Sequence, residues 1–255
     1  MARFLILKSI FKIKIHLFFY IFLFICLITG NIRDYFIFTS IIIVHELGHI
    51  FSGLFFSWKI EEIIVLPFGC LTVFQQMINT SLLEQFIVTL CGPLFQIVFY
   101  FILNCFFSLS DNVVYYNLVL LIFNLIPIYP LDGSKLLYVF LCLLFPFKFC
   151  HLILIFISFV FVFLIILFVG RFDLIVYLVL FFLVVKDIRE FKNHSMVFNR
   201  FLFERYLYDL YFDKIKIVDS HKKMYLWCRH VFFLNDKYIT EREYLLKRFD
   251  KHSDL

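Results

Sequence analysis

The chain has little charge, and its charge is unevenly distributed. Charged residues make up 17% of the sequence, hydrophobic residues make up 63%, and the mean hydropathy is +0.95. These values exclude an ordinary soluble domain, in which about 25% of residues are charged. Residues 1–185 hold 9 of the 24 Lys and Arg residues, whereas the last 70 residues hold 15, together with 11 acidic residues. The sequence therefore predicts a membrane domain followed by a polar tail.

The cysteines show no metal or disulfide pattern. There are 7 of them, mostly inside apolar runs, and none forms a CxxC pair. This arrangement favours neither a disulfide framework nor a cysteine-rich zinc site. We expect the cysteines to serve as small hydrophobic residues.

One apolar segment nevertheless carries ionisable residues. Residues 35–56 contain no lysine, arginine or aspartate, yet they include His45-Glu46-Leu-Gly-His49. In a helix, His45 and His49 lie one turn apart on the same face, and Glu46 is rotated by about 100° from His45 around the helix axis. Two imidazoles so placed can bind one Zn²⁺ while the carboxylate reaches the metal-bound water. In a soluble helix the same motif is often an ordinary exposed face. Here each ionisable group costs roughly 2.5–3.5 kcal/mol when the helix inserts into the bilayer. Because a membrane helix does not carry such residues without a function, their presence favours a metal site in the membrane.

Apolar segments predict about six membrane spans. The first lacks a small-residue cleavage site, so we expect an uncleaved anchor. Loops on one side hold only Arg33 and Arg171, and the other basic residues lie on the opposite side. The positive-inside rule therefore places both termini in the cytoplasm. The predicted spans are 15–29, 35–56, 85–107, 113–131, 149–169 and 172–185.

The segment between the second and third spans is too short and too interrupted for a spanning helix. Its β-branched residues flank Pro67-Phe-Gly69, which predicts an extended hairpin over 60–75. Non-helical backbone at membrane depth requires protein or a water-filled cavity to satisfy its polar groups. The sequence leaves open whether this hairpin is re-entrant beside the site or a surface connection.

A second polar cluster follows the fourth span. It reads Asn124-Leu-Ile-Pro127-Ile-Tyr-Pro130-Leu-Asp132-Gly133. The two prolines break the helix, so periodicity does not decide whether Asn124 shares a face with Asp132. Catalytic zinc takes three protein ligands and keeps one open position, and Asp132 could be the third ligand. Taken alone, Asp132 is more often a turn residue or a helix cap.

Together these motifs resemble the site-2 protease family of intramembrane zinc metalloproteases, within it the stage IV sporulation protein FB branch. HELGH, LPFG, Gly-Pro and NxxPxxPLDG match in order and spacing over about residues 1–190. The resemblance implies that His45, His49 and Asp132 bind Zn²⁺. It also implies Glu46 as the general base and Asn124 as a contact for the substrate or the oxyanion.

The sequence departs from the family pattern at two places. Gln96 stands where many relatives have asparagine after the Gly-Pro, and Ser134-Lys135 replaces Gly-Arg. Neither departure touches the implied ligands, so they bear on substrate handling more than on metal binding.

The tail gives weaker patterns. Residues 214–219 alternate like a strand, segment 196–212 reads as an interfacial helix, and Thr240-Glu-Arg-Glu243 has the form of a capping box. The tail histidines, His194, His221, His230 and His252, are expected to be solvated. Sporulation relatives carry a nucleotide-sensing CBS domain at this place, for which residues 191–255 are too few.

The predicted fold is an all-α polytopic membrane protein with a re-entrant β-hairpin between its second and third spans, plus a small cytosolic α/β tail. Residues 1–190 form the expected intramembrane metalloprotease domain, and 191–255 form a tail that is truncated or degenerate relative to a CBS domain. By resemblance the substrate is a membrane-associated sigma-factor precursor of the pro-σK type. Inhibitory membrane proteins are possible partners besides the lipid bilayer, and no nucleic acid is expected.

The alternative is a membrane metal-ion transporter. In that case His45, Glu46, His49 and Asp132 would bind a cation in transit. A transporter is expected to show more polar residues along its other spans, or an internal repeat. The sequence shows neither, so the protease is favoured.

Overall fold

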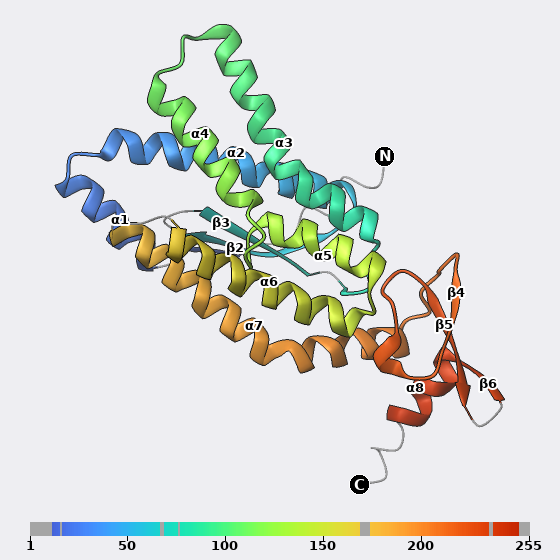
Figure 1. Cartoon of the computed structure of the whole chain (residues 1–255). Helices are drawn as coiled ribbons and strands as arrows, with labels where there is room; N and C mark the ends of the chain where they lie inside the picture. Colours follow the sequence, from blue (N-terminus) through green and yellow to red (C-terminus); the bar gives the residue numbers. More distant parts are fainter. Residues whose placement is uncertain are drawn as a thin grey trace. The chain divides into compact units, whose positions relative to one another are not determined.

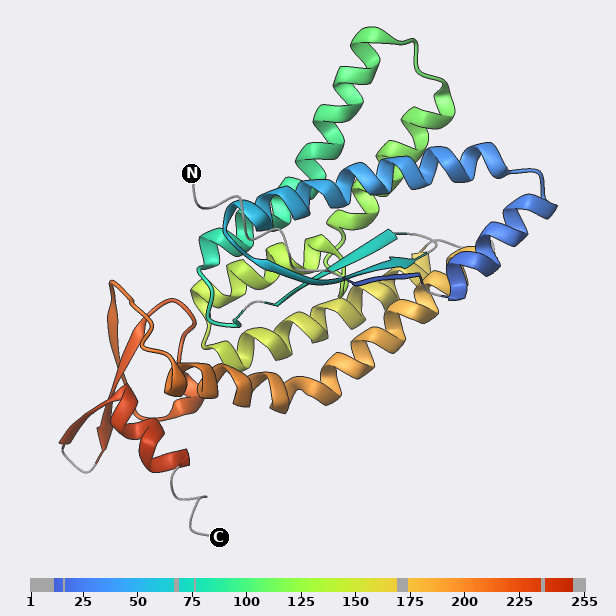
Figure 2. The same ribbon diagram turned by 180° about the vertical axis from the view of Figure 1, so that it is seen from behind.

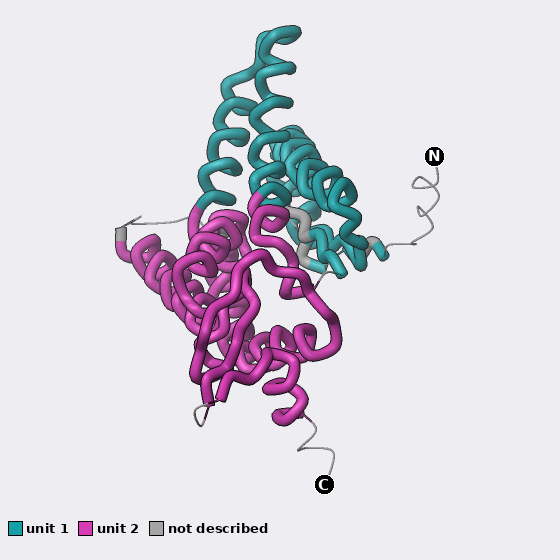
Figure 3. The backbone as a smooth tube through the Cα atoms, turned by 90° about the vertical axis from the view of Figure 1, so that its right-hand side faces the viewer, with its two compact units in different colours: residues 1–76, 87–125 teal, residues 77–86, 126–255 magenta. Residues whose placement is uncertain are grey.

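The computed structural model describes residues 12–15, 17–66, 69–75, 77–168, 174–234 and 237–249. Pro67, Arg171 and His252, which the sequence placed in a hairpin, an outer loop and the tail, lie outside these residues. The chain divides into two compact units (Figure 3). Unit 1 comprises residues 1–76 and 87–125, and unit 2 comprises residues 77–86 and 126–255.

Unit 1 is built mainly from helices. They are α1 (Leu17–Ile28), α2 (Ile32–Phe55), α3 (Leu82–Phe106), which enters this unit at residue 87, and α4 (Asp111–Leu125) (Figure 1). Gly30 has a φ of 75° between α1 and α2, a conformation that glycine adopts without steric cost. Ile41 and Ile42 of α2 pack against Leu120 of α4. This contact fixes the face that α2 turns inward.

A small sheet completes unit 1. Its strands are β1 (Lys12–Ile15), β2 (Lys59–Leu66) and β3 (Gly69–Gln75), in the order β1-β2-β3 (Figures 1 and 2). β1 pairs with β2 in parallel, and β2 pairs with β3 in antiparallel register with Ile63 opposite Thr72. The extended hairpin predicted over 60–75 is therefore present as a strand pair. Its depth in a membrane stays a prediction.

Unit 2 packs α5 (Asp132–Leu144), α6 (Phe147–Phe168) and α7 (Leu174–Leu207) around an aromatic core. The rings of Phe147 and Phe201 stack with centroids 4.2 Å apart and planes 9° apart, and both side chains are fully buried. Stacked aromatic pairs add to the stabilisation that burial provides. The first turn of α6 thus packs against α7 through this core.

The segment around Asp132 differs from the predicted fourth span at 113–131. α4 ends at Leu125, and Asp132 is the first residue of a new helix rather than the end of the old one. Pro127 and Pro130 provide the reason, because neither can donate the backbone hydrogen bond that would continue α4. Gly133 is the second residue of α5.

α7 is longer than the sequence predicted. The sixth span at 172–185 and the interfacial helix at 196–212 belong largely to one continuous helix of 34 residues. The helix continues because Phe198, Phe201 and Leu202 bury an apolar face beyond the expected span. The expected boundary between residues 190 and 191 consequently falls inside α7.

Three helices of the described residues are long and apolar enough to cross a membrane. They are Ile32–Phe55, Leu82–Phe106 and Phe147–Leu167. α1 and α4 are apolar but shorter, with 12 and 15 residues, whereas a span takes about 20. The count of about six spans therefore stays a prediction.

The tail folds as a three-stranded sheet with a helix. The strands are β4 (Ile215–Val218), β5 (Arg229–Leu234) and β6 (Lys237–Thr240), in that order, and α8 (Glu241–Phe249) follows directly. The backbone nitrogen of Glu243 donates to Oγ1 of Thr240, and that of Thr240 donates to Oε2 of Glu243, both at 3.3 Å. This reciprocal pair is the capping box that the sequence predicted. The predicted strand at 214–219 is likewise present as β4.

Two histidines expected in solvent are buried. His230 is 1% exposed and His194 is 9% exposed. His230 contacts Glu241, which also pairs with the buried Arg205 at 3.0 Å. Nδ1 of His194 lies 2.9 Å from Nδ1 of His151. The prediction was wrong because sequence polarity does not reveal contacts between distant elements: His194 on α7 faces His151 on α6, and His230 on β5 faces Glu241 on α8.

Candidate metal centre

The two histidines of the HELGH motif face inward from α2 and are almost fully buried, at 3% and 5% exposure. Nδ1 of His49 lies 2.8 Å from the backbone oxygen of Val88, which can only accept a hydrogen bond. Nδ1 of His45 lies 2.9 Å from Oε1 of Gln96. Both rings therefore carry a proton on Nδ1, so Nε2 is the atom with which each ring could bind a metal.

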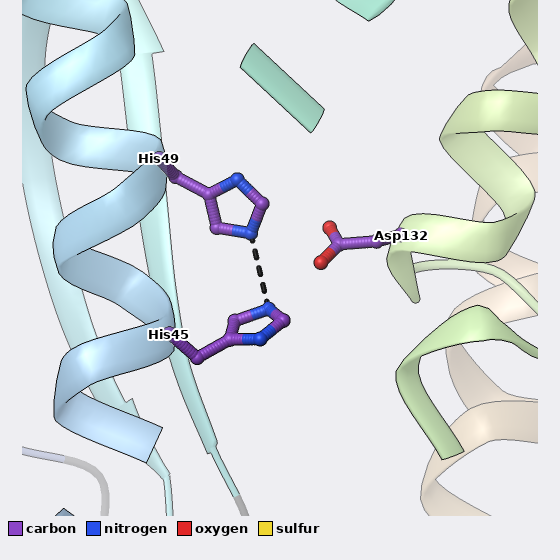
Figure 4. Close-up of side chains that lie close together, drawn as sticks. All are labelled: His45, His49 and Asp132. Atoms are coloured by element: carbon purple, nitrogen blue, oxygen red, sulfur yellow. Dashed lines mark hydrogen bonds between the residues drawn. The ribbon is translucent and has the colours of Figure 1, made fainter. Parts of the chain in front are cut away.

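The two Nε2 nitrogens point at each other. The Nε2 atoms of His45 and His49 are 3.2 Å apart (Figure 4). Two facing lone pairs repel at this distance unless a cation or a proton lies between them. Zinc–nitrogen bonds of 2.0–2.1 Å in a tetrahedral site place the two nitrogens about 3.3 Å apart. The pair therefore fits the geometry of a zinc site.

Asp132 supplies a third ligand atom. It is 4% exposed, and one ligand atom from each of His45, His49 and Asp132 lies within 4.8 Å of the others (Figure 4). Nζ of Lys135, one turn along α5, donates to Oδ1 of Asp132 at 2.9 Å. Two imidazole nitrogens and a carboxylate are the ligand types that catalytic zinc takes.

Two glycines let α3 approach α2 at the histidines. A Cβ atom on Gly48 would overlap the backbone carbonyl of Cys91, and one on Gly92 would overlap the imidazole of His49. Larger residues at either position would push the helices apart. The Gly-Pro motif in α3 thus has a direct steric role at the histidine pair.

The other two predicted site residues lie on α2 and α4. Glu46 is half-buried, and its Oε2 accepts a hydrogen bond of 2.9 Å from Oγ1 of Thr72 on β3. Asn124 lies half-buried in the last turn of α4. The roles assigned to Glu46 and Asn124 stay predictions.

Sequence reasoning missed three residues around this centre. Gln96 entered only as a departure from a family pattern. The expectation that neither departure touches the ligands was wrong, because Gln96 contacts His45 and Lys135 contacts Asp132. Asn117 and Thr72 were not considered. Gln96 and Asn117 are buried polar residues inside apolar helices, which was the available signal. Thr72 gave no signal, because threonine is common in strands.

Comparisons with known proteins agree with this geometry. Residues 35–115 match the sequence profile of peptidase family M50. The chain is 33% identical over 210 residues to stage IV sporulation protein FB of Bacillus subtilis, covering 78% of this chain and 73% of that protein. It is 31% identical over 106 residues to a zinc metalloprotease of Methanocaldococcus jannaschii, covering 38% of this chain and 30% of that protein.

The fold resembles that of a solved structure as well. The site-2 protease from Methanocaldococcus jannaschii aligns with a TM-score of 0.55 and 24% identity, over 70% of this chain and 89% of that one. None of these matches favours the transporter alternative. Because the match to the Bacillus subtilis protein spans most of both chains, this chain belongs to peptidase family M50 and is a zinc metalloprotease of the site-2 protease type.

Proposed function

We propose that this protein cleaves a membrane-associated protein near the cytoplasmic leaflet. The observation that carries the proposal is the buried pair of His45 and His49, whose Nε2 atoms face each other at 3.2 Å with Asp132 within ligand distance. Burial inside an apolar helix favours proteolysis at membrane depth. We propose these three residues as the zinc ligands, within a domain over residues 1–190 that has about six spans and both termini in the cytoplasm.

The chemistry follows from the side chains around the ligands. Zinc bound there would act as a Lewis acid and would lower the pKa of the attacking water to about 7. Glu46 accepts the proton of the attacking water and returns it to the leaving amine. Asn124 donates a hydrogen bond to the developing oxyanion. Both roles are proposals for residues that the structure places on α2 and α4.

A substrate helix has to unwind before cleavage, because its backbone groups are bonded to one another. We propose that the hairpin β2–β3 is re-entrant and holds the unwound segment as an added strand. In the described residues, β3 pairs with β2 along one edge, which leaves its other edge open for pairing. Thr72, the contact of Glu46, lies on this strand.

We further propose that the substrate is a sigma-factor precursor of the pro-σK type. This rests on the 33% identity to stage IV sporulation protein FB. A cytosolic transcription factor with a membrane-associated prosequence reaches the cytoplasmic face on which the charge distribution places the site. Inhibitory membrane proteins are proposed as regulators, and residues 191–255 as a cytosolic tail.

The test is co-expression of the intact protein with a candidate precursor. Glu46→Gln keeps size and polarity but removes the base, so cleavage should fall about 10²–10⁴-fold while zinc stays bound. Asp111→Asn is the matched control, since it removes an exposed carboxylate at the start of α4. Cleavage by Glu46→Gln at the wild-type rate would overturn the mechanism. Ion flux without cleavage would instead indicate a transporter.

A further inference from the structure

Gln96 lies where three helices of unit 1 meet, and both ends of its amide are bonded. It extends from α3 and is 1% exposed. Its Oε1 is 2.9 Å from Nδ1 of His45 on α2. Its Nε2 donates to Asn117 on α4, at 2.8 Å to the backbone oxygen and 3.1 Å to Oδ1. The amide thus bridges the proposed metal ligand to the neighbouring helix.

These bonds fix which way the amide points. The backbone oxygen of Asn117 can only accept, so the nitrogen of Gln96 must face α4. The reversed amide would set two oxygens against each other at 2.8 Å in a buried site, which is strongly unfavourable. Oε1 of Gln96 consequently faces His45.

The direction of the amide fixes the tautomer of the histidine. Oε1 can only accept, so Nδ1 of His45 must carry the proton and Nε2 must present its lone pair. A hydrogen bond to the distal ring nitrogen also fixes the plane of a metal-bound imidazole and raises its basicity. His49 obtains the same bond from a backbone carbonyl, whereas His45 depends on a side chain.

We propose that Gln96, anchored by Asn117, is a positioning residue that holds His45 in the tautomer and orientation required to bind zinc. This inference rests on the proposed assignment of His45 as a zinc ligand. A residue that only links α3 to α4 would contribute to stability and leave metal affinity unchanged. The two roles therefore differ in the zinc dissociation constant.

The experiment measures zinc affinity of the purified full-length protein by competition with a chelator in detergent. Gln96→Met keeps the length of the side chain but removes the acceptor, and should weaken zinc binding by about 10–100-fold. Gln85→Met is the matched control on the same helix, because the side-chain amide of Gln85 bonds to Thr80 rather than to a histidine of the centre. It should bind zinc as the wild type does.

A second measurement does not depend on the variant folding. Histidine ¹⁵N spectra of the zinc-loaded wild type should show His45 protonated at Nδ1 and metal-bound at Nε2. A proton on Nε2 of His45 would overturn the inference, as would unchanged zinc affinity in folded Gln96→Met. Failure of the metal site itself is separable, because in that case His45→Ala would also leave zinc binding unchanged.

Discussion

Thr72 on β3 donates a hydrogen bond of 2.9 Å to the carboxylate of Glu46 on α2. The bond orients the carboxylate of the proposed base. Thr72→Val removes the donor at constant shape, and hydrogen bonds to charged groups contribute about 1.5–3 kcal/mol. We expect kcat for precursor cleavage to fall about tenfold or more with zinc content unchanged. Thr72→Ser, which keeps the hydroxyl, should retain activity; equal kcat in wild type and Thr72→Val would contradict this role.

The third ligand can be tested by metal content. Asp132→Ala removes the proposed carboxylate ligand, so purified protein should lose both zinc and activity. Asp111→Ala, which alters an exposed residue at the start of α4, should change neither. Zinc stoichiometry measured by mass spectrometry decides the matter. Full zinc occupancy in Asp132→Ala would mean that Asp132 serves only to begin α5.

Asn124 is expected to act on turnover rather than on metal binding. Loss of one oxyanion donor typically slows an enzyme by about 10²–10³-fold. Asn124→Ala should therefore lower kcat by this amount while the zinc content stays at the wild-type level. The comparison needs single-turnover rates on one precursor. A loss of zinc in this variant would assign Asn124 to the structure of the site instead.

Local patterns in the sequence predicted several features correctly. The two histidines share a face because four residues make about one helical turn, and both are buried as expected. The capping box at Thr240 and Glu243 formed because its bonds involve only neighbouring residues. The hairpin over 60–75 followed from β-branched residues around a turn.

Features that depend on contacts between distant segments were not predictable in this way. The amide of Gln96 meets His45 and Asn117 across two helix interfaces, and no periodicity in one helix specifies such a contact. α7 continues past its expected end because Phe201 is buried in the core of unit 2. The burial of His230 likewise depends on Glu241, which lies on a different element.

Close packing of α2 against its neighbours predicts that alanine is tolerated less well at Gly48 than at Gly53. A Cβ on Gly48 would meet the backbone of Cys91, whereas one on Gly53 would meet the ring of Phe74. A ring can rotate away, but a backbone carbonyl in a helix cannot. Gly48→Ala should therefore cost about 1–3 kcal/mol in unfolding free energy, and Gly53→Ala should cost less. Unfolding in detergent measures both, and equal losses would contradict the close approach at Gly48.

The stability of the tail should depend on pH through His221. Burial lowers the pKa of His221 to about 4, and the positive charges of Arg248 and Lys222 add to the effect. In the unfolded chain a histidine titrates near about 6.5, so between these values the unfolded state binds the additional proton. Stability from this residue is therefore complete above about pH 6.5 and is lost progressively as the pH falls toward 4.

His221→Phe isolates this contribution. The ring of His221 packs near Phe198 and Tyr244, and phenylalanine can occupy the same place without titrating. Loss of the 3.0 Å contact between Nδ1 and the hydroxyl of Tyr244 should lower the stability of the variant above about pH 6.5, where His221 is neutral in both states. Other titrating groups act equally on both proteins, so their effects cancel in the difference. Melting temperatures in detergent should show the wild type losing stability relative to His221→Phe between pH 6.5 and 4, whereas parallel curves would mean that His221 titrates normally in the folded protein.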